Sequence, residues 1–185
     1  MKVLGKGSVA SIIKVALHVA GIFLWIGMIG LIVGIIGYAV ALGLLLSGVI
    51  DVNLPGEGAW DYLMWPIVVP ALTIGAVAIG GSLLIVRRLR RLFESLTSGE
   101  PFRRENAEHL RVIWITMLVM EVARYVFGGA VLALIAAFGA PPDLDTHFEA
   151  EAFDFAPWIS ILVIIVLAEV FREGARLREE QELTI

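Results

Sequence analysis

The sequence predicts an all-α polytopic membrane protein, with a bundle of four transmembrane helices and a helical cytoplasmic tail. Hydrophobic residues make up 59% of its 185 residues, and the mean hydropathy of +0.89 is far above that of a soluble protein. The apolar residues form four continuous runs, each close to or above the roughly 20 residues that cross a bilayer as a helix. A transmembrane β-barrel would need shorter, alternating segments, so these runs favour helices.

The first apolar run carries no charged residue from Val15 to Ile50, and it predicts a helix over residues 15–46. It is longer than the apolar core of a signal peptide, so we expect it to remain in the membrane. A helix over the whole run would be about 54 Å long, whereas the hydrocarbon core is about 30 Å thick. We therefore expect this helix to tilt, to project from the membrane or to break at a glycine.

Small residues line one face of this first helix at three- and four-residue spacing, and they include Gly27, Gly30, Gly34 and Gly37. In a membrane, such a stripe lets another helix approach closely. We expect close helix packing here rather than a substrate groove. The sequence leaves open whether the partner helix belongs to the same chain or to a second copy in a homo-oligomer.

Three more helices are predicted over residues 62–86, 112–138 and 155–175. The second continues into an arginine run, and the fourth becomes polar after Phe171, which is typical of a helix that leaves the membrane. The connections are too short to hold a separate globular domain of ordinary size. Residues 1–185 are therefore expected to form a single membrane domain.

Lysine and arginine lie before the first helix and between the second and the third, whereas the other two connections contain acidic residues but no lysine or arginine. The positive-inside rule then places both termini in the cytoplasm. At the end of the second helix, we expect an arginine cluster to meet anionic lipid headgroups: Arg87, Arg88, Arg90 and Arg91. The net charge of −4 and the lack of a recognition motif argue against direct nucleic-acid binding.

Two charged residues, Glu121 and Arg124, lie near the middle of the third apolar run, where ionised side chains are costly unless they find a partner. Their three-residue spacing places them on one face of the helix. Glu169 lies in the fourth run, and we expect the antiparallel helices to bring it to a similar depth. Because one guanidinium can donate to two carboxylates, these residues are predicted to form a buried triad. A structural ion pair is the favoured interpretation, with a ligand- or proton-sensing site and a transport pathway as alternatives.

The last connection carries an alternating acidic pattern with one histidine: Asp143, Asp145, His147, Glu149 and Glu151. In an extended strand, these side chains would project to one side and offer oxygen and imidazole ligands to a divalent cation. Acidic outward loops are common, however, and neither zinc-site nor EF-hand spacing is present. We therefore expect no bound metal and no cofactor, and these residues remain only candidate ligands.

Short motifs in the second half of the chain include Gly99-Glu100-Pro101-Phe102, Asn106, Leu110-Arg111 and the polar tail that follows Leu167. Together they resemble the bacterial membrane family called domain of unknown function 2975. The resemblance implies a small four-helix protein of the bacterial cytoplasmic (inner) membrane, whose relatives often accompany a helix-turn-helix transcriptional regulator. It implies no activity and no catalytic residues, and the long first apolar run departs from a typical member.

The sequence contains no HExxH, GxSxG, P-loop or Rossmann motif and no cysteine, so we expect no enzyme activity. The leading hypothesis is a noncatalytic membrane protein with a regulatory or sensory role. Such a protein would report through its cytoplasmic segments to a helix-turn-helix regulator. The alternative is a transporter or channel for a small molecule or an ion, which the charges within the membrane suggest.

Overall fold

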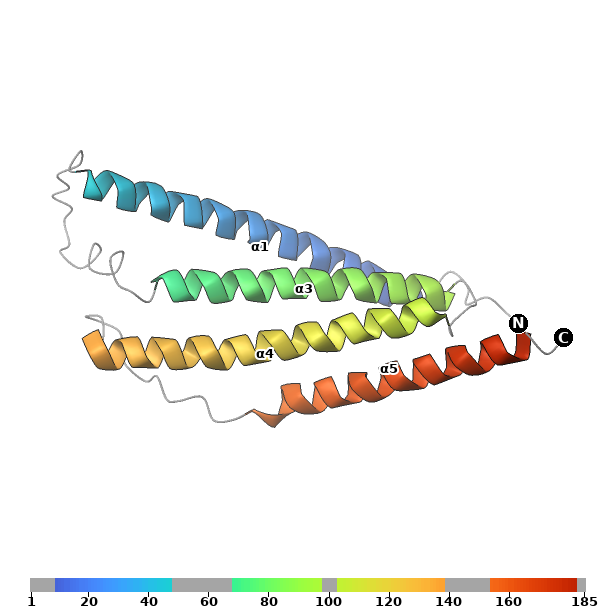
Figure 1. Cartoon of the computed structure of the whole chain (residues 1–185). Coiled ribbons are helices and arrows are strands. Elements are labelled where there is room, and N and C mark those ends of the chain that lie inside the picture. Colours follow the sequence, from blue (N-terminus) through green and yellow to red (C-terminus); the bar gives the residue numbers. More distant parts are fainter. Residues whose placement is uncertain (1–8, 48–67, 98–102, 139–153, 183–185) are drawn as a thin grey trace.

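The computed structural model describes residues 9–47, 68–97, 103–138 and 154–182 of the chain. These residues form four helices in the order α1 (Val9–Leu46), α3 (Val68–Thr97), α4 (Arg104–Phe138) and α5 (Phe155–Glu182) (Figure 1). Each helix is long and apolar enough to cross a membrane. The predicted all-α fold with four membrane spans is therefore confirmed.

The helices extend further at one end than the apolar runs predict. Helices α3 and α5 continue past their apolar runs to Thr97 and Glu182, as the arginine run and the polar tail predict. Helix α4 begins at Arg104, earlier than the predicted residue 112. These added turns are rich in Arg, Glu and Leu, which are good helix formers, so the helices continue after the apolar run has ended. The predicted start of the last helix at residue 155 agrees with the structure.

Helix α1 is continuous over its 38 residues and does not break at any of its glycines. At 1.5 Å per residue it is about 57 Å long, nearly twice the thickness of the hydrocarbon core. Figure 1 shows α1 inclined to α3, with the two helices closest near the start of α1 and further apart at its end. The sequence predicts that this helix tilts, projects from the membrane or breaks at a glycine. The break is wrong, and the inclination of α1 to α3 is consistent with a tilted helix.

The four helices lie side by side as an open row rather than around a closed centre (Figure 1). Among the described residues, α1 packs on α3, α3 on α4 and α4 on α5, and no other pair of helices is in contact. We call one end of this row the basic end: it contains the start of α1, the end of α3 from Arg87, the start of α4 as far as Arg111, and the end of α5 from Arg172. The outer helices α1 and α5 each pack through one side, so their remaining apolar surface would face lipid.

The densest packing of the row lies at the basic end. Side chains with less than a tenth of their surface exposed gather there from α3, α4 and α5: Leu92, Asn106, Ala107, Leu110 and Ala175, with Ile113 just inside the apolar run. Asn106 is only 1% exposed. Its Nδ2 donates a hydrogen bond of 2.7 Å to the Ser95 Oγ, which ties the start of α4 to the end of α3.

The predicted glycine stripe on α1 contacts the rest of the described chain at only one of its four positions. A Cβ added at Gly27 would lie 3.7 Å from Ile79 Cδ1, but one added at Gly30, Gly34 or Gly37 would have no described atom within 4 Å. Within the described chain, no helix packs closely on these three glycines. A second copy as the partner stays a prediction.

The close helix approach is instead made by Gly81 on α3, which the glycine pattern did not single out. A Cβ added there would lie 2.8 Å from Met120 Cγ on α4 and would also overlap the Met120 sulfur. Because real Cβ atoms do not approach other carbons so closely, the absence of a side chain at Gly81 lets Met120 pack against the α3 backbone.

We expect Gly81→Ala to lower the free energy of unfolding by about 1 to 3 kcal/mol, because Met120 must move to make room. Gly34→Ala is the matched control: it meets open space, so the better helix propensity of alanine should leave stability equal or raise it by up to about 1 kcal/mol. Reversible unfolding in lipid bicelles measures both. In a Met120→Ala background the cost of Gly81→Ala should shrink, and an unchanged cost would contradict the contact.

Candidate functional site

The candidate site is the ion pair between Glu121 and Arg124 on α4. Arg124 Nη2 donates to Glu121 Oε1 at 2.7 Å, and the Glu121 side chain is only 10% exposed. Glu121 lies nine residues, about 14 Å along the helix, beyond the start of the apolar run at Val112. The structure thus confirms the predicted pairing of these two residues on one face of the helix.

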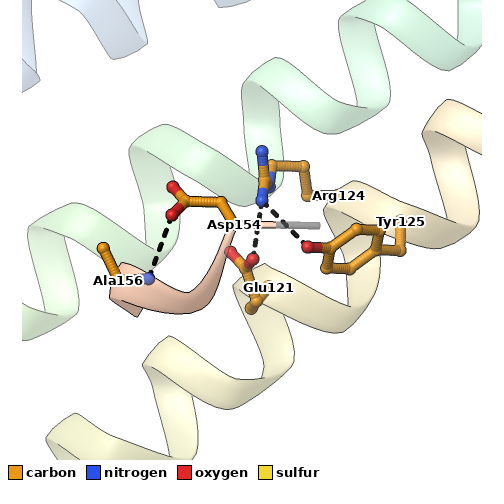
Figure 2. Close-up of polar contacts among 5 residues, drawn as sticks. All are labelled: Glu121, Arg124, Tyr125, Asp154 and Ala156. Atoms are coloured by element: carbon orange, nitrogen blue, oxygen red, sulfur yellow. Dashed lines mark hydrogen bonds and ion pairs between the residues drawn. The ribbon is translucent and has the colours of Figure 1, made fainter. Parts of the chain in front are cut away.

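The structure adds Tyr125 to this pair. Arg124 Nη2 also donates to the Tyr125 hydroxyl at 3.3 Å, and the guanidinium carbon lies 4.9 Å from the centre of the tyrosine ring. Figure 2 shows one guanidinium nitrogen joined both to the carboxylate of Glu121 and to the phenol of Tyr125. Little more than one turn of the helix therefore supplies both a charged and a neutral acceptor, which reduces the cost of placing Arg124 in the membrane.

Helix α5 begins beside this site. The Asp154 carboxylate accepts a hydrogen bond of 3.0 Å from the Ala156 backbone N–H, so Asp154 caps the helix and sets its first residue at Phe155. Figure 1 shows α5 starting alongside the middle of α4, and Figure 2 shows Asp154 and Ala156 near Glu121 and Arg124. An aspartate directly before an apolar run is a helix-start signal, and it was the sequence feature that could have placed Asp154 here.

The predicted third member of the cluster, Glu169, is not brought to this site. Glu169 forms an ion pair with Arg172 on its own helix, and its side chain is 58% exposed. The expectation of a similar depth was wrong because Glu169 lies only three residues from Arg172, about 5 Å from the end of the apolar run. Glu121 lies about three times deeper. The carboxylate that α5 contributes near Arg124 is that of Asp154, not Glu169.

Glu121 and Arg124 carry opposite charges and pair at 2.7 Å on one face of one helix. This pairing offsets part of the cost of burying each charge. The Asp154 carboxylate lies near the pair in Figure 2, where it accepts from the Ala156 N–H.

The four predicted lipid-binding arginines do not act alike in the structure. The Arg87 guanidinium lies over the ring of Trp25 on α1, with 5.4 Å between its carbon and the ring centre. Arg88 points to α4, where its Nη1 lies 3.3 Å from His109 Nδ1. Because a guanidinium can only donate, His109 Nδ1 accepts, and the ring proton is on Nε2. Arg87 thus belongs to the α1–α3 contact and Arg88 to the α3–α4 contact.

The predicted metal-ligand candidates Asp143, Asp145, His147, Glu149 and Glu151 lie outside the described residues. Within the described ranges, no group of three or more His, Asp or Glu side chains is placed to hold a metal ion. Sequence reasoning missed four residues that the structure adds to these contacts: Trp25, Ser95, Tyr125 and Asp154. Asn106 was noted only as part of the family resemblance, and nothing in its local sequence distinguishes a buried asparagine from an exposed one.

The four apolar helices and the ion pair buried within one of them define a multi-pass α-helical membrane protein. The chain belongs to the family described as "Protein of unknown function (DUF2975)", whose model matches residues 57–185. The match contains α3, α4 and α5 with the Glu121–Arg124 pair, and it begins after the end of α1. No curated protein and no solved structure matches the chain significantly.

We expect Arg124→Leu to lower the free energy of unfolding by about 3 to 5 kcal/mol, because it leaves the Glu121 carboxylate buried without this partner. The double variant Glu121→Leu/Arg124→Leu removes both charges and should recover much of that loss. Unfolding in lipid bicelles at neutral pH measures both variants. Equal stability of Arg124→Leu and the parent would show that the pair is not buried in the membrane.

Proposed function

We propose that this chain is a noncatalytic regulatory or sensory protein of the bacterial inner membrane, and that the basic end is its output surface. The proposed partner is a helix-turn-helix transcriptional regulator in the cytoplasm. The observation that carries the proposal is that α3, α4 and α5 continue without interruption from their apolar runs into the packed basic end.

This continuity gives a physical route for a signal. A helix is stiff over this length, so a shift of α4 or α5 within the membrane also moves the part of the same helix outside it. At the basic end the three helices share buried side chains, among them Asn106 on α4 and Ala175 on α5. A shift of one helix would therefore change how the three helices pack together there.

The end of α5 supplies a candidate contact surface beyond this packed region. Glu173 and Arg176 pair at 2.8 Å, and Arg176 Nε lies 3.4 Å from Glu180 Oε1, so consecutive turns are linked along the helix. Such pairs support a helix that has left the apolar run. Leu177 lies among these charges and is 50% exposed, which is a suitable surface for an apolar side chain of a partner.

The uneven distribution of lysine and arginine supports a cytoplasmic location for the basic end and for both termini. The acidic connections would then lie outside. In this orientation the basic end and the tail of α5 are accessible to a soluble regulator. The choice of a helix-turn-helix protein as the partner rests on the family resemblance alone.

Deleting residues 178–185 should leave membrane insertion intact and change the free energy of unfolding by less than about 0.5 kcal/mol, because Ala175 is the last buried side chain described on α5. Capture of a helix-turn-helix regulator from the native host should fall strongly. A full-length variant with the same tail residues in scrambled order separates sequence-specific docking from simple charge attraction. If the truncated, scrambled and parent proteins capture the same proteins equally, the tail is not the docking surface.

A transporter or channel is the second candidate function, and the one observation that favours it is the Glu121–Arg124 pair near the middle of the membrane with Asp154 beside it. Ion flux into liposomes distinguishes the two functions. Flux that is present in the parent and absent in Glu121→Gln would support transport, whereas no flux from a correctly folded protein would support the regulatory role.

A further inference from the structure

We propose that Arg87 and Arg91 on α3, together with Trp25 on α1, form a binding site for the headgroup of an anionic membrane phospholipid. This inference goes beyond the proposed regulatory function and does not depend on it. The three residues come from two helices, so the site exists only where α1 crosses the end of α3.

The position of the site at the membrane boundary is the first argument. Arg87 directly follows the apolar run of α3, which ends at Val86. Helices α1 and α3 are in contact at this level, because a Cβ added at Gly21 would lie 3.8 Å from Val86 Cγ1. Phospholipid phosphates lie at this depth, immediately outside the hydrocarbon core.

The second argument is that Arg87 and Arg91 can act on the same ligand. They are four residues apart, so they occupy one face of α3 and lie one turn from each other. Both residues are exposed. Arg88 differs from them because it is directed to His109 on α4, and we therefore leave it out of the site.

The third argument is that neither arginine forms an ion pair with a described residue, which separates them from the arginines of α5. Arg172 and Arg176 each form an ion pair with a glutamate of their own helix. Among the described residues, no ion pair involves Arg87 or Arg91. At the same boundary, these arginines of α5 are paired with glutamates, whereas Arg87 and Arg91 of α3 are not paired with any described acid. The positive charge on α3 therefore favours an anionic ligand there.

Trp25 gives the site its geometry. The Arg87 guanidinium carbon lies over the Trp25 ring, 5.4 Å from the ring centre, and Trp25 is itself 49% exposed. A cation–π contact uses none of the guanidinium N–H donors as a hydrogen bond to an oxygen, so two phosphate oxygens can accept them. Tryptophan is also the residue type that favours the membrane interface.

The ligand to which these observations point is a lipid rather than free phosphate. The site opens where an apolar helix surface meets the headgroup layer, so acyl chains would contact α1 and α3 while the phosphate meets Arg87 and Arg91. A soluble anion would gain only the second of these interactions. The apolar side chains exposed on α1 near the site include Ile22, Phe23 and Ile26.

The test uses the purified full-length protein in nanodiscs of phosphatidylcholine alone and of an equimolar mixture with phosphatidylglycerol. The parent should have a higher unfolding temperature in the mixture, and competition titration should show preferential retention of phosphatidylglycerol. In Arg87→Gln/Arg91→Gln, the apparent affinity for phosphatidylglycerol should fall roughly thirtyfold, because each arginine near a charged headgroup layer contributes on the order of fivefold. Trp25→Leu keeps both arginines and should weaken binding roughly threefold.

The matched control is Arg172→Gln/Arg176→Gln, which removes the same charge from the same end of the row and should retain the preference for phosphatidylglycerol. Arg87→Lys/Arg91→Lys keeps the charge and should retain most of the binding, so it serves if the glutamine variant does not fold. The proposal is overturned if the parent shows no preference, or if the control loses as much affinity as Arg87→Gln/Arg91→Gln. It is also overturned if inorganic phosphate stabilises the parent in phosphatidylcholine nanodiscs as much as phosphatidylglycerol does.

Discussion

The packing of the end of α3 against the start of α4 is the contact on which the rest of the structure depends. In an open row, α3 and α4 are the two central helices, and each outer helix is attached to one of them. Leu92 on α3 and Leu110 on α4 are both almost fully buried, and Asn106 and Ser95 add a hydrogen bond between the two helices. Loss of this contact would separate α1 and α3 from α4 and α5.

The chemistry of the two environments explains why the packing is densest at this end. Within a bilayer, apolar side chains are equally well solvated by lipid, so there is little hydrophobic drive for one helix to cover another. Beyond the apolar runs, water restores that drive, and burial of leucine becomes favourable again. The extension of α3, α4 and α5 past the boundary is therefore what allows a row of membrane helices to acquire a stable core.

Most of the local structure could be predicted from the sequence. The four helices, the start of α5 at Phe155 and the pairing of Glu121 with Arg124 all follow from apolar runs, a helix cap and a three-residue spacing. The contacts between helices were harder to predict. Glu169 was assigned to the wrong partner because its depth depends on where α5 ends its apolar run, and Gly81 was overlooked because its importance depends on Met120 on another helix.

The same distinction applies to the arginine run at the end of α3. The sequence shows four nearby arginines, and the helical repeat places all four on one broad face of α3. The sequence therefore does not separate their roles. Only the neighbouring helices show that Arg87 meets Trp25 on one side while Arg88 meets His109 on the other. The first contact leaves Arg87 exposed, and the second joins α3 to α4. One short segment therefore contacts the helices on both sides of α3.

The most direct test of this account compares two alanine substitutions of equally buried side chains. Leu110 at the basic end and Ile161 within the apolar run of α5 are both 3% exposed. In lipid bicelles, Leu110→Ala should lower the free energy of unfolding by about 2 to 5 kcal/mol. Ile161→Ala should cost clearly less, because lipid can replace the lost contacts. Equal costs, or a larger cost for Ile161→Ala, would contradict the view that the row is held together at the basic end.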